Sequence, residues 1–430
     1  MTLSKTTLYS LAILLFPIFA FTQIFESEVN PDGIVFPRMT TVDRDALTAI
    51  QGQCIYNIDS NSIECFNGSD WQANIQSNSI TTPKFGNSGG LTYQAGYNTN
   101  IGRGEATRFS NDTIMIASSY WDTLSGQVRI TAYAGKNWIT PVGAIYGENY
   151  NDNFGRSIAS TNDGKHVVIT APGYNDNTGA IYFGYGNNIT DLANYQKVIS
   201  PSNNIGSSFG ADVDIDENYA IVGSAGENKA YIFYYNGASW VLNWTLVPPN
   251  GLPSSQFGFS VAIDGTRAIV TDNIDSKVHL YELASGSWSF KQTISAPNDC
   301  LNEPLCFFGT NADISNSSLV IHSLVEVYTY EATNSGTFVP FETIGLAPFG
   351  VTFRYGKSFV SINGSTLGAR LNDGKIHFYC KVNGTWNHVG YGIDNAQFVE
   401  IRKDESSILT SGQFDRDNDF GNGYRVYNSN

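Results

Sequence analysis

Charged side chains are scarce in this sequence. Asp, Glu, Lys and Arg make up 15% of its 430 residues, whereas about 25% is usual for a globular protein. Basic residues are the fewest, with 24 Lys and Arg against 39 Asp and Glu, so the net charge is −15 at pH 7. A nucleic-acid-binding protein needs a patch of Lys and Arg to displace counterions from the phosphates. The composition therefore argues against a nucleic-acid partner and identifies no other.

Recognisable catalytic motifs are missing as well. The sequence has no HExxH, no CxxC pair and no Walker loop, and its five histidines are scattered. His279 and His377 stand in the similar segments KVHLY and KIHFY, where packing of a repeated strand explains them better than metal ligation. Residues 86–90 spell G-x-S-x-G, but a linker precedes them and a strand-like segment follows, unlike a nucleophile elbow. We therefore predict no catalytic residue and a protein that is not an enzyme.

Only the N-terminus carries a long apolar run. Lys5 precedes the apolar stretch 8–19, which is too short to span a bilayer comfortably, and 20–22 offers small residues for cleavage. This pattern predicts a signal peptide over 1–22, with an uncleaved membrane anchor as the alternative. No later segment is apolar enough to cross a membrane, so we expect an exported protein, secreted or at the cell surface.

Cysteine is also rare, with five residues. Cys54 and Cys65 flank a turn-like segment, and Cys300 and Cys306 bracket a short loop, so each pair is predicted to form a disulfide. Cys380 is left over in an apolar strand-like run, where a buried, unreactive thiol is expected.

Glycine and aromatic residues, by contrast, are abundant and recur in a pattern. A Phe-Gly or Tyr-Gly pair begins similar phrases at 154, 209, 257, 308 and 355. Each phrase contains four runs of β-branched and aromatic residues separated by Gly, Asn or Asp turns. A four-stranded unit that repeats about every 50 residues is typical of a propeller blade. A series of β-sandwiches is the alternative, but it would not place the same turn chemistry at the same offset.

Two weaker units, 101–150 and 396–430, complete a count of seven. We therefore predict an all-β protein with a seven-bladed β-propeller over 91–430, a linker over 73–90 and a small helix-plus-hairpin module over 23–72. The last unit has only three strands of its own, so its open edge needs a partner. We predict that the alternating segment 91–97 pairs with 423–428 and closes the ring.

Two resemblances follow from these motifs. ITAP at 169–172 with GAIYF at 179–183, and IVGSAG at 221–226, resemble the FG-GAP repeat of integrin alpha-chain propellers and their secreted bacterial relatives. The resemblance covers 91–430 and weakens after 306. Residues 30–72 are similar to a short module near the N-terminus of secreted Bacteroidetes proteins and some fibre proteins. Within it, Thr40 or Thr41 is expected to cap a helix that runs to Ile50.

Candidate ligand sites are few. FG-GAP blades of the integrin type often carry a calcium loop between the first two strands, but these turns are short here, so that site is not carried over. Asp415, Asp417 and Asp419 alternate as oxygen ligands for Ca²⁺ do, which makes calcium the one candidate cofactor and a solvated acidic loop the alternative. Trp138, Trp240, Trp288 and Trp386 recur in the fourth strands, where they are expected to pack blade against blade, or alternatively to stack on a glycan.

These patterns favour a non-catalytic secreted or cell-surface protein that binds an extracellular protein or glycan through one propeller face. The first alternative is an extracellular polysaccharide lyase or hydrolase that uses the propeller funnel, since propellers host both kinds of protein. The second is a subunit of a larger surface assembly, attached through the N-terminal module. Neither the ligand nor the oligomeric state follows from the sequence.

Overall fold

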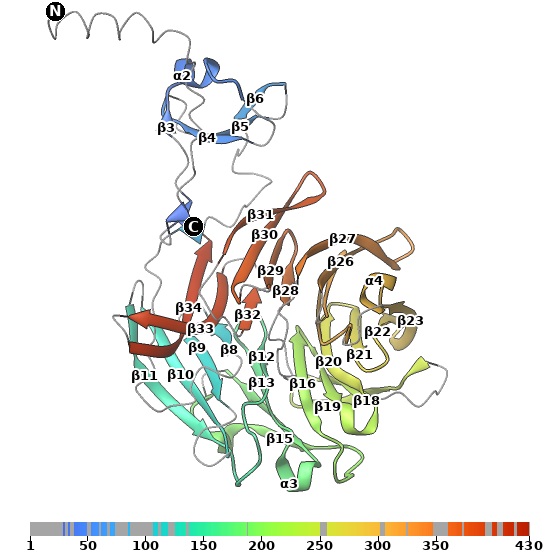
Figure 1. Ribbon diagram of the computed structural model, residues 1–430. Coiled ribbons are helices and arrows are strands. Elements are labelled where there is room, and N and C mark those ends of the chain that lie inside the picture. Colours follow the sequence, from blue (N-terminus) through green and yellow to red (C-terminus); the bar gives the residue numbers. More distant parts are fainter. Residues whose placement is uncertain are drawn as a thin grey trace, which may run out of the picture. The chain divides into compact units, whose positions relative to one another are not determined.

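The computed structural model (Figure 1) describes residues 29–30, 33–34, 38–49, 53–59, 62–66, 69–73, 85–86, 106–110, 113–118, 125–134, 137–186, 188–249, 256–301, 306–323, 326–346, 360–371, 374–391, 398–401, 407–416 and 419–429, some of them by their backbone alone. The chain divides into two compact units, residues 1–81 and 82–430. No helix in the described ranges is long and apolar enough to cross a bilayer.

The first unit contains the predicted N-terminal module. Its elements are β1 (Val29–Asn30), β2 (Gly33–Ile34), β3 (Arg38–Met39), α2 (Thr41–Asp45), β4 (Cys54–Asn57), β5 (Ser62–Phe66) and β6 (Trp71–Ala73). β1 and β2 form a two-stranded sheet, and the other strands form a sheet in the order β3-β4-β5-β6. β4 and β5 are antiparallel, as expected of the predicted hairpin, whereas β3 pairs with β4 in parallel across the helix.

The second unit begins with three four-stranded sheets. Blade 1 comprises β8 (Ala106–Ser110), β9 (Thr113–Ser118), β10 (Gln127–Ala134) and β11 (Asn137–Tyr146). Blade 2 comprises β12 (Ile158–Ser160), β13 (His166–Ala171), β14 (Ala180–Tyr185) and β15 (Gln196–Ile199), with the short helices α3 (Tyr174–Asn177) and η1 (Leu192–Asn194) in its loops. Blade 3 comprises β16 (Phe209–Asp216), β17 (Tyr219–Ser224), β18 (Lys229–Tyr235) and β19 (Trp240–Leu246), with η2 (Ala225–Glu227).

Three further sheets and a composite one follow. Blade 4 comprises β20 (Phe257–Asp264), β21 (Arg267–Asp272), β22 (Lys277–Ala284) and β23 (Ser287–Ser295), followed by α4 (Asn298–Leu301). Blade 5 comprises β24 (Asn311–Ser315), β25 (Ser318–His322), β26 (Glu326–Ala332) and β27 (Phe338–Leu346). Blade 6 comprises β28 (Val360–Asn363), β29 (Thr366–Arg370), β30 (Ile376–Val382) and β31 (Thr385–Tyr391). Blade 7 comprises β32 (Phe398–Ile401), β33 (Ser407–Arg416), β34 (Asp419–Ser429) and β7 (Phe85–Gly86).

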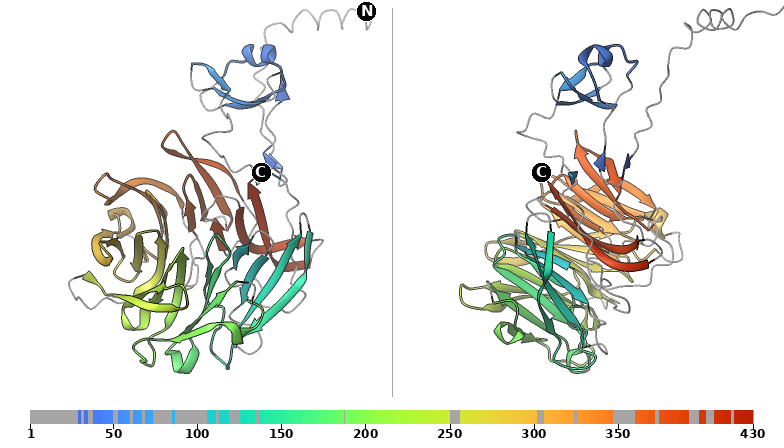
Figure 2. Two further views of the ribbon diagram at one scale, coloured as in Figure 1. Left: turned by 180° about the vertical axis from the view of Figure 1, so that it is seen from behind. Right: turned by 90° about the vertical axis from the view of Figure 1, so that its left-hand side faces the viewer.

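These seven antiparallel sheets follow one another around a central axis, with the first strand of each blade innermost (Figures 1 and 2). The predicted all-β, seven-bladed propeller is therefore confirmed. Tight turns such as 217–218 in blade 3 and 265–266 in blade 4 join the first two strands of a blade, which favours antiparallel pairing of neighbouring strands.

Ring closure differs from the prediction. The outer edge of β34 is paired with β7, so that Asn428 lies opposite Gly86 and Ser429 opposite Phe85. The chain upstream of blade 1 does supply the missing fourth strand, but with 85–86, which the sequence assigned to the linker. Residues 91–97 lie outside the described residues. Pairing of this kind uses backbone groups, so the alternation of side chains in 91–97 was not a sufficient guide.

The repeated Phe-Gly pairs explain why the blades pack at a regular interval. Phe154, Phe209, Phe257 and Phe308 are each fully buried. The glycines that follow them have φ between +79° and +92°, a region that residues with a side chain rarely adopt. At Gly258, a Cβ atom would lie 2.2 Å from the carbonyl oxygen of Lys229. The glycine therefore lets the backbone turn sharply while the phenylalanine before it fills the core.

Candidate functional site

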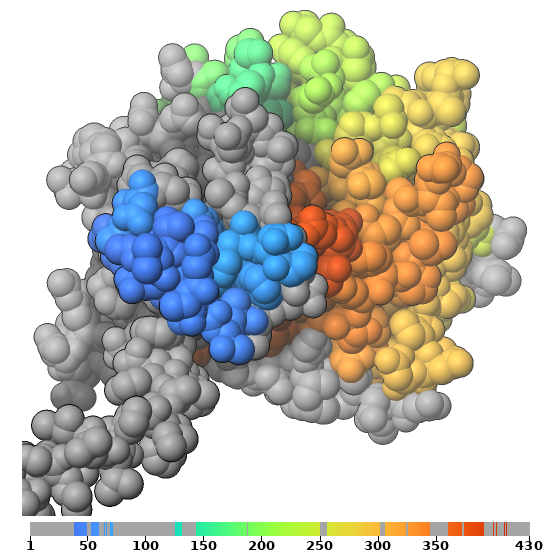
Figure 3. Space-filling view, turned by 90° about the horizontal axis from the view of Figure 1, so that it is seen from above, coloured from blue at the N-terminus to red at the C-terminus, as the bar shows by residue number. Residues whose placement is uncertain are grey.

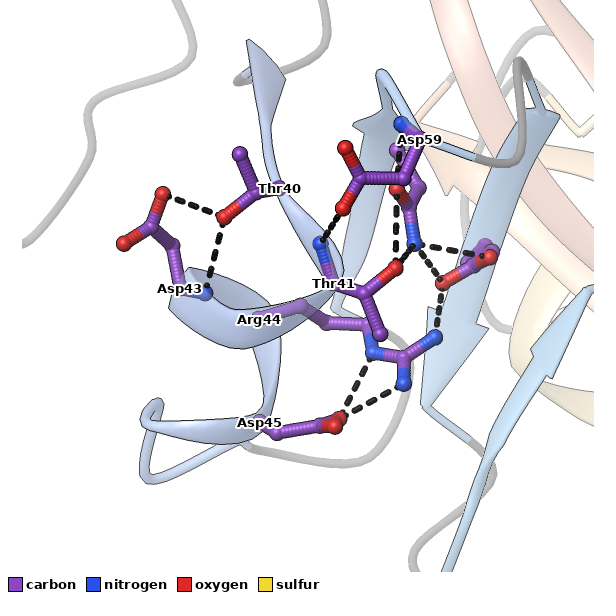
Figure 4. Close-up of polar contacts among 8 residues, drawn as sticks. Thr40, Thr41, Asp43, Arg44, Asp45 and Asp59 are labelled. Carbon is purple, nitrogen blue, oxygen red and sulfur yellow. Dashed lines mark hydrogen bonds and ion pairs between the residues drawn. The ribbon is translucent and has the colours of Figure 1, made fainter.

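The helix of the N-terminal module begins at a capped threonine. Thr40 Oγ1 accepts a hydrogen bond from the Asp43 backbone N–H at 3.1 Å and donates one to the Asp43 carboxylate at 2.7 Å. The backbone N–H of Thr41 donates to Asp59 Oδ2 at 2.8 Å (Figure 4). These bonds satisfy donors that the first helical turn leaves without partners. Thr40 is thus the cap, one of the two predicted residues.

The same helix is shorter than predicted, ending at Asp45 rather than at Ile50. Its last turn tightens, since the backbone N–H of Leu47 donates to the carbonyl oxygen of Arg44 three residues before it. Ile50 lies outside the described residues.

A buried polar cluster joins this helix to the sheet. Glu64 on β5 and Asn57 on β4 are buried, and Asn57 Nδ2 lies 3.0 Å from both carboxylate oxygens of Glu64. Arg44 from the helix forms an ion pair with Glu64, which raises the pKa of the guanidinium, and a second one with Asp45 at 2.6 Å (Figure 4). A buried carboxylate without partners is strongly destabilising. The cluster therefore fixes the helix on the sheet.

The apolar core of the module is small. Among its described residues, only Met39 and Ile55 are buried apolar side chains, while Val42 is 77% and Ile58 47% exposed. Burying one such side chain contributes about 1.5–3 kcal/mol, while ordering one residue costs roughly 1–2 kcal/mol. The described atoms form a small body, blue in Figure 3. Among the described residues, polar contacts such as the Arg44–Glu64 ion pair therefore add to a small apolar core.

The predicted disulfides lie in different units. Cys300 and Cys306 form a disulfide in the loop between blades 4 and 5, and Cys380 is a buried thiol outside any disulfide, as expected. Cys54 is disulfide-bonded and lies opposite Cys65 in the β4–β5 hairpin. The side chain of Cys65 is outside the described residues, so the Cys54–Cys65 pair stays a prediction that the register favours.

The predicted calcium site cannot be assembled from the described atoms. Asp415 lies in β33 and Asp419 in β34, at the end of their hairpin, whereas Asp417 and the side chains of all three residues lie outside the described part of the chain. Elsewhere in that part, no three His, Cys, Asp or Glu side chains form a group able to hold a metal ion. Calcium binding stays a prediction.

Carboxylates on the innermost strands have a structural role that was not predicted from the sequence. Asp212 and Asp214 on β16 accept hydrogen bonds from the backbone N–H groups of Val261 and Ile263 on β20, at 2.9 and 2.8 Å. In the same way, Asp313 on β24 accepts from Ile362 of β28 at 2.9 Å. The alternation in DVDID at 212–216 was the available signal. These side chains replace the ladder bonds that neighbouring inner strands cannot make with each other.

The fourth-strand tryptophans and most histidines are structural. Trp240, Trp288 and Trp386 are buried, so the expected packing between blades is correct for these three and a row of exposed glycan-stacking rings is not formed by them. The side chain of Trp138 lies outside the described residues. Burial lowers the pKa of His166, of His279 to about 4 and of His322 to about 3, which keeps all three imidazoles neutral at pH 7.

The N-terminal region matches a known protein family. Residues 22–88 match the family described as "phage tail like trimerisation region". This range contains the N-terminal module together with β7. No curated protein matches the sequence.

Solved structures resemble the propeller. A protein from Lactobacillus plantarum has a TM-score of 0.50 and 12% identity, over 73% of this chain and 99% of its own. A "putative 6-phosphogluconolactonase" from Bacteroides uniformis has a TM-score of 0.45 and 12% identity, over 72% and 94%. A protein of the same description from Bacteroides fragilis has a TM-score of 0.47 and 13% identity, over 72% and 93%. At this identity the likeness concerns the fold alone.

One prediction is corrected by this comparison. The absence of a catalytic motif led us to predict that the protein is not an enzyme. Two of these structures carry the description "putative 6-phosphogluconolactonase". Propellers host enzymes as well as binding proteins, so the lack of a known motif does not exclude catalysis, and the prediction is withdrawn. HExxH, CxxC and Walker motifs are local in sequence, whereas a propeller can assemble a site from residues on several blades.

Proposed function

We propose that this protein is an exported binding protein that associates into trimers through its N-terminal module and presents the propeller to an extracellular protein or glycan. The observation that carries the proposal is the match of residues 22–88 to the phage tail like trimerisation region. A trimer of this kind holds three binding heads together, which raises the avidity for a multivalent surface well above the affinity of one head.

The composition of the module supports self-association. Two large apolar side chains, Val42 and Ile58, are exposed on a module whose described core has only two buried apolar residues. Burial of these side chains against two further copies would supply apolar area that the isolated module lacks. Trimer formation and folding of the module would then be coupled.

A binding role for the propeller is supported by its resemblance to the FG-GAP repeat. The repeated phrases lie where blades require them, with Phe209 and Phe257 beginning the innermost strands of blades 3 and 4. Export is supported by the signal-like residues 1–22 and by the Cys300–Cys306 disulfide, a bond that persists in oxidising compartments.

Sedimentation velocity of the full exported chain tests the assembly. We expect a trimer, and we expect Val42→Glu and Ile58→Glu to shift it toward the monomer because each would bury a charge between the copies. Ile205→Glu is the matched control, since Ile205 in the propeller is 75% exposed, close to the 77% of Val42. A monomeric wild-type protein, or a trimer that both module variants leave unchanged, would contradict the proposal.

Glycan and protein arrays probed with the same chain test the binding role. We expect one ligand class to be retained, with tighter apparent binding by the trimer than by the Val42→Glu variant. Release of sugar products from a retained polysaccharide would instead establish the enzymatic alternative.

A further inference from the structure

Two of the scattered histidines meet on the outer half of blade 6. His377 on β30 and His388 on β31 place Nδ1 and Nε2 3.0 Å apart (Figure 1 shows the two strands). They are diagonal neighbours, because a shift of register between Phe378 and Tyr379 brings His388 opposite Tyr379. His388 is exposed and His377 is half-buried.

The position of His377 has a structural explanation of its own. The third residue of the third-strand phrase is Tyr182, Tyr231, His279, Tyr328 and His377 in blades 2 to 6. In blades 2 to 5 its ring lies 5.3–5.6 Å from the phenylalanine of the Phe-Gly pair. A single histidine here is therefore a variation on a packed aromatic ring.

The position of His388 is explained in part by a similar contact, since its ring lies 5.2 Å from that of Tyr379, as the ring of Phe290 lies 6.0 Å from that of Tyr281 in blade 4. The corresponding residues on the fourth strands of blades 3, 4 and 5 are Leu242, Phe290 and Pro340, identified by their register with Phe233, Tyr281 and Tyr330. Each of these is apolar. Blade 4 has a histidine on its third strand, His279, but none at the fourth-strand position. Blade 6 has a histidine at both positions.

We propose that His377 and His388 chelate a divalent transition-metal ion such as Zn²⁺ or Ni²⁺. Imidazole nitrogens lie about 2.0–2.1 Å from bound zinc, so two nitrogens of one zinc site are roughly 3.0–3.4 Å apart for bond angles between about 90° and 110°. The observed 3.0 Å falls within this range, so the two nitrogens already have the spacing that a shared ion requires. The single proton shared between the two nitrogens would shift to the other nitrogen of its ring.

The rest of the coordination shell follows from the exposure of the pair. The described residues contain no group of three His, Cys, Asp or Glu side chains, so within them the two imidazoles are the protein ligands of the proposed site. Imidazole is a favourable ligand for zinc, nickel and copper, whereas magnesium and calcium prefer oxygen. The site is therefore expected to discriminate against Ca²⁺ and to be distinct from the acidic loop at 415–419.

Isothermal titration of the untagged, full exported chain with Zn²⁺ and with Ni²⁺ at pH 7.5 tests this site. We expect one ion per chain, and at least a tenfold loss of affinity in His388→Phe and in His377→Tyr. Both substitutions introduce residues that other blades already carry at the same positions, namely Phe290 and Tyr328, so the fold should be kept. Circular dichroism melting of each variant checks that it is.

His279→Tyr is the matched control, because it makes the same change in blade 4, where no second histidine is adjacent, and it should leave metal affinity unchanged. Wild-type protein that binds neither ion would overturn the proposal. So would an affinity that His388→Phe leaves intact, or one that His279→Tyr lowers equally. If His388→Phe is unfolded, His388→Leu replaces it in the same comparison, because blade 3 carries Leu242 at this position.

Discussion

His279 makes the propeller sensitive to acid in a way that one substitution should remove. The side chain is 4% exposed, its ring centroid lies 5.5 Å from that of Phe257, and its Nδ1 lies 3.0 Å from the hydroxyl of Thr293. Burial lowers the pKa of His279 from 6.5 to about 4, with a further lowering by Lys277 that Asp275 partly opposes. The native protein therefore keeps this imidazole neutral under conditions in which the unfolded chain protonates it.

The sign of the effect follows from proton binding. Between pH 6.5 and about 4, the unfolded state binds a proton that the native state does not, so the free energy of unfolding falls as the pH is lowered. The contribution is absent above the unfolded pKa and complete below the native one. At pH 4.5 these two pKa values correspond to a loss of about 2–3 kcal/mol from this residue.

His279→Tyr removes the titrating group while it keeps an aromatic ring of the kind that Tyr231 and Tyr328 provide in the adjacent blades. We expect wild type and variant to have similar urea midpoints at pH 7.5, and the variant to be the more stable by about 2–3 kcal/mol at pH 4.5. Unfolding followed by tryptophan fluorescence measures both. Equal losses of stability in the two proteins between pH 7.5 and 4.5 would refute this mechanism, since acidic groups common to both cancel in the difference.

Two further predictions concern the backbone and the inner strands. Gly258→Ala should lower the free energy of unfolding by well over the roughly 1 kcal/mol expected for a left-handed backbone alone. The reason is that the new Cβ atom would overlap the carbonyl group of Lys229. Gly237→Ala is the control, because Gly237 has nearly the same φ but no atom within 4 Å of the position that its Cβ would take. Equal midpoint shifts in denaturant would contradict this. Asp313→Ala should lower the free energy of unfolding by about 1–3 kcal/mol for each donor left unpaired. Asp313→Asn should lower it less, because Asn keeps an oxygen that can accept from the Ile362 N–H. Equal losses of stability in the two variants would show that the acceptor is unimportant.

The sequence identified blades better than it identified contacts between them. Strand alternation, Phe-Gly pairs and tight turns act over a few residues, so they appear directly in the order of amino acids. The Cys300–Cys306 loop and the Thr40 cap are local in the same sense, and both were predicted correctly. The helix end was not, because it depends on how α2 packs on its sheet.

The contacts that join distant segments were decided by the tertiary structure. Asp212 meets Val261, 49 residues away, only because consecutive inner strands lie side by side around the axis. Closure by Phe85 and Gly86 follows from which backbone edge is within reach, and side-chain patterns do not encode that.

The histidine pair shows the same division. The sequence by itself determined a repeated four-stranded unit, and with it the aromatic position that His377 occupies. Only the shift of register between β30 and β31 decided that His388 lies beside it, because moving a strand pairing by one residue changes which side chains share a face. Local chemistry thus fixed the blades, while the register within and between them fixed which functional groups meet.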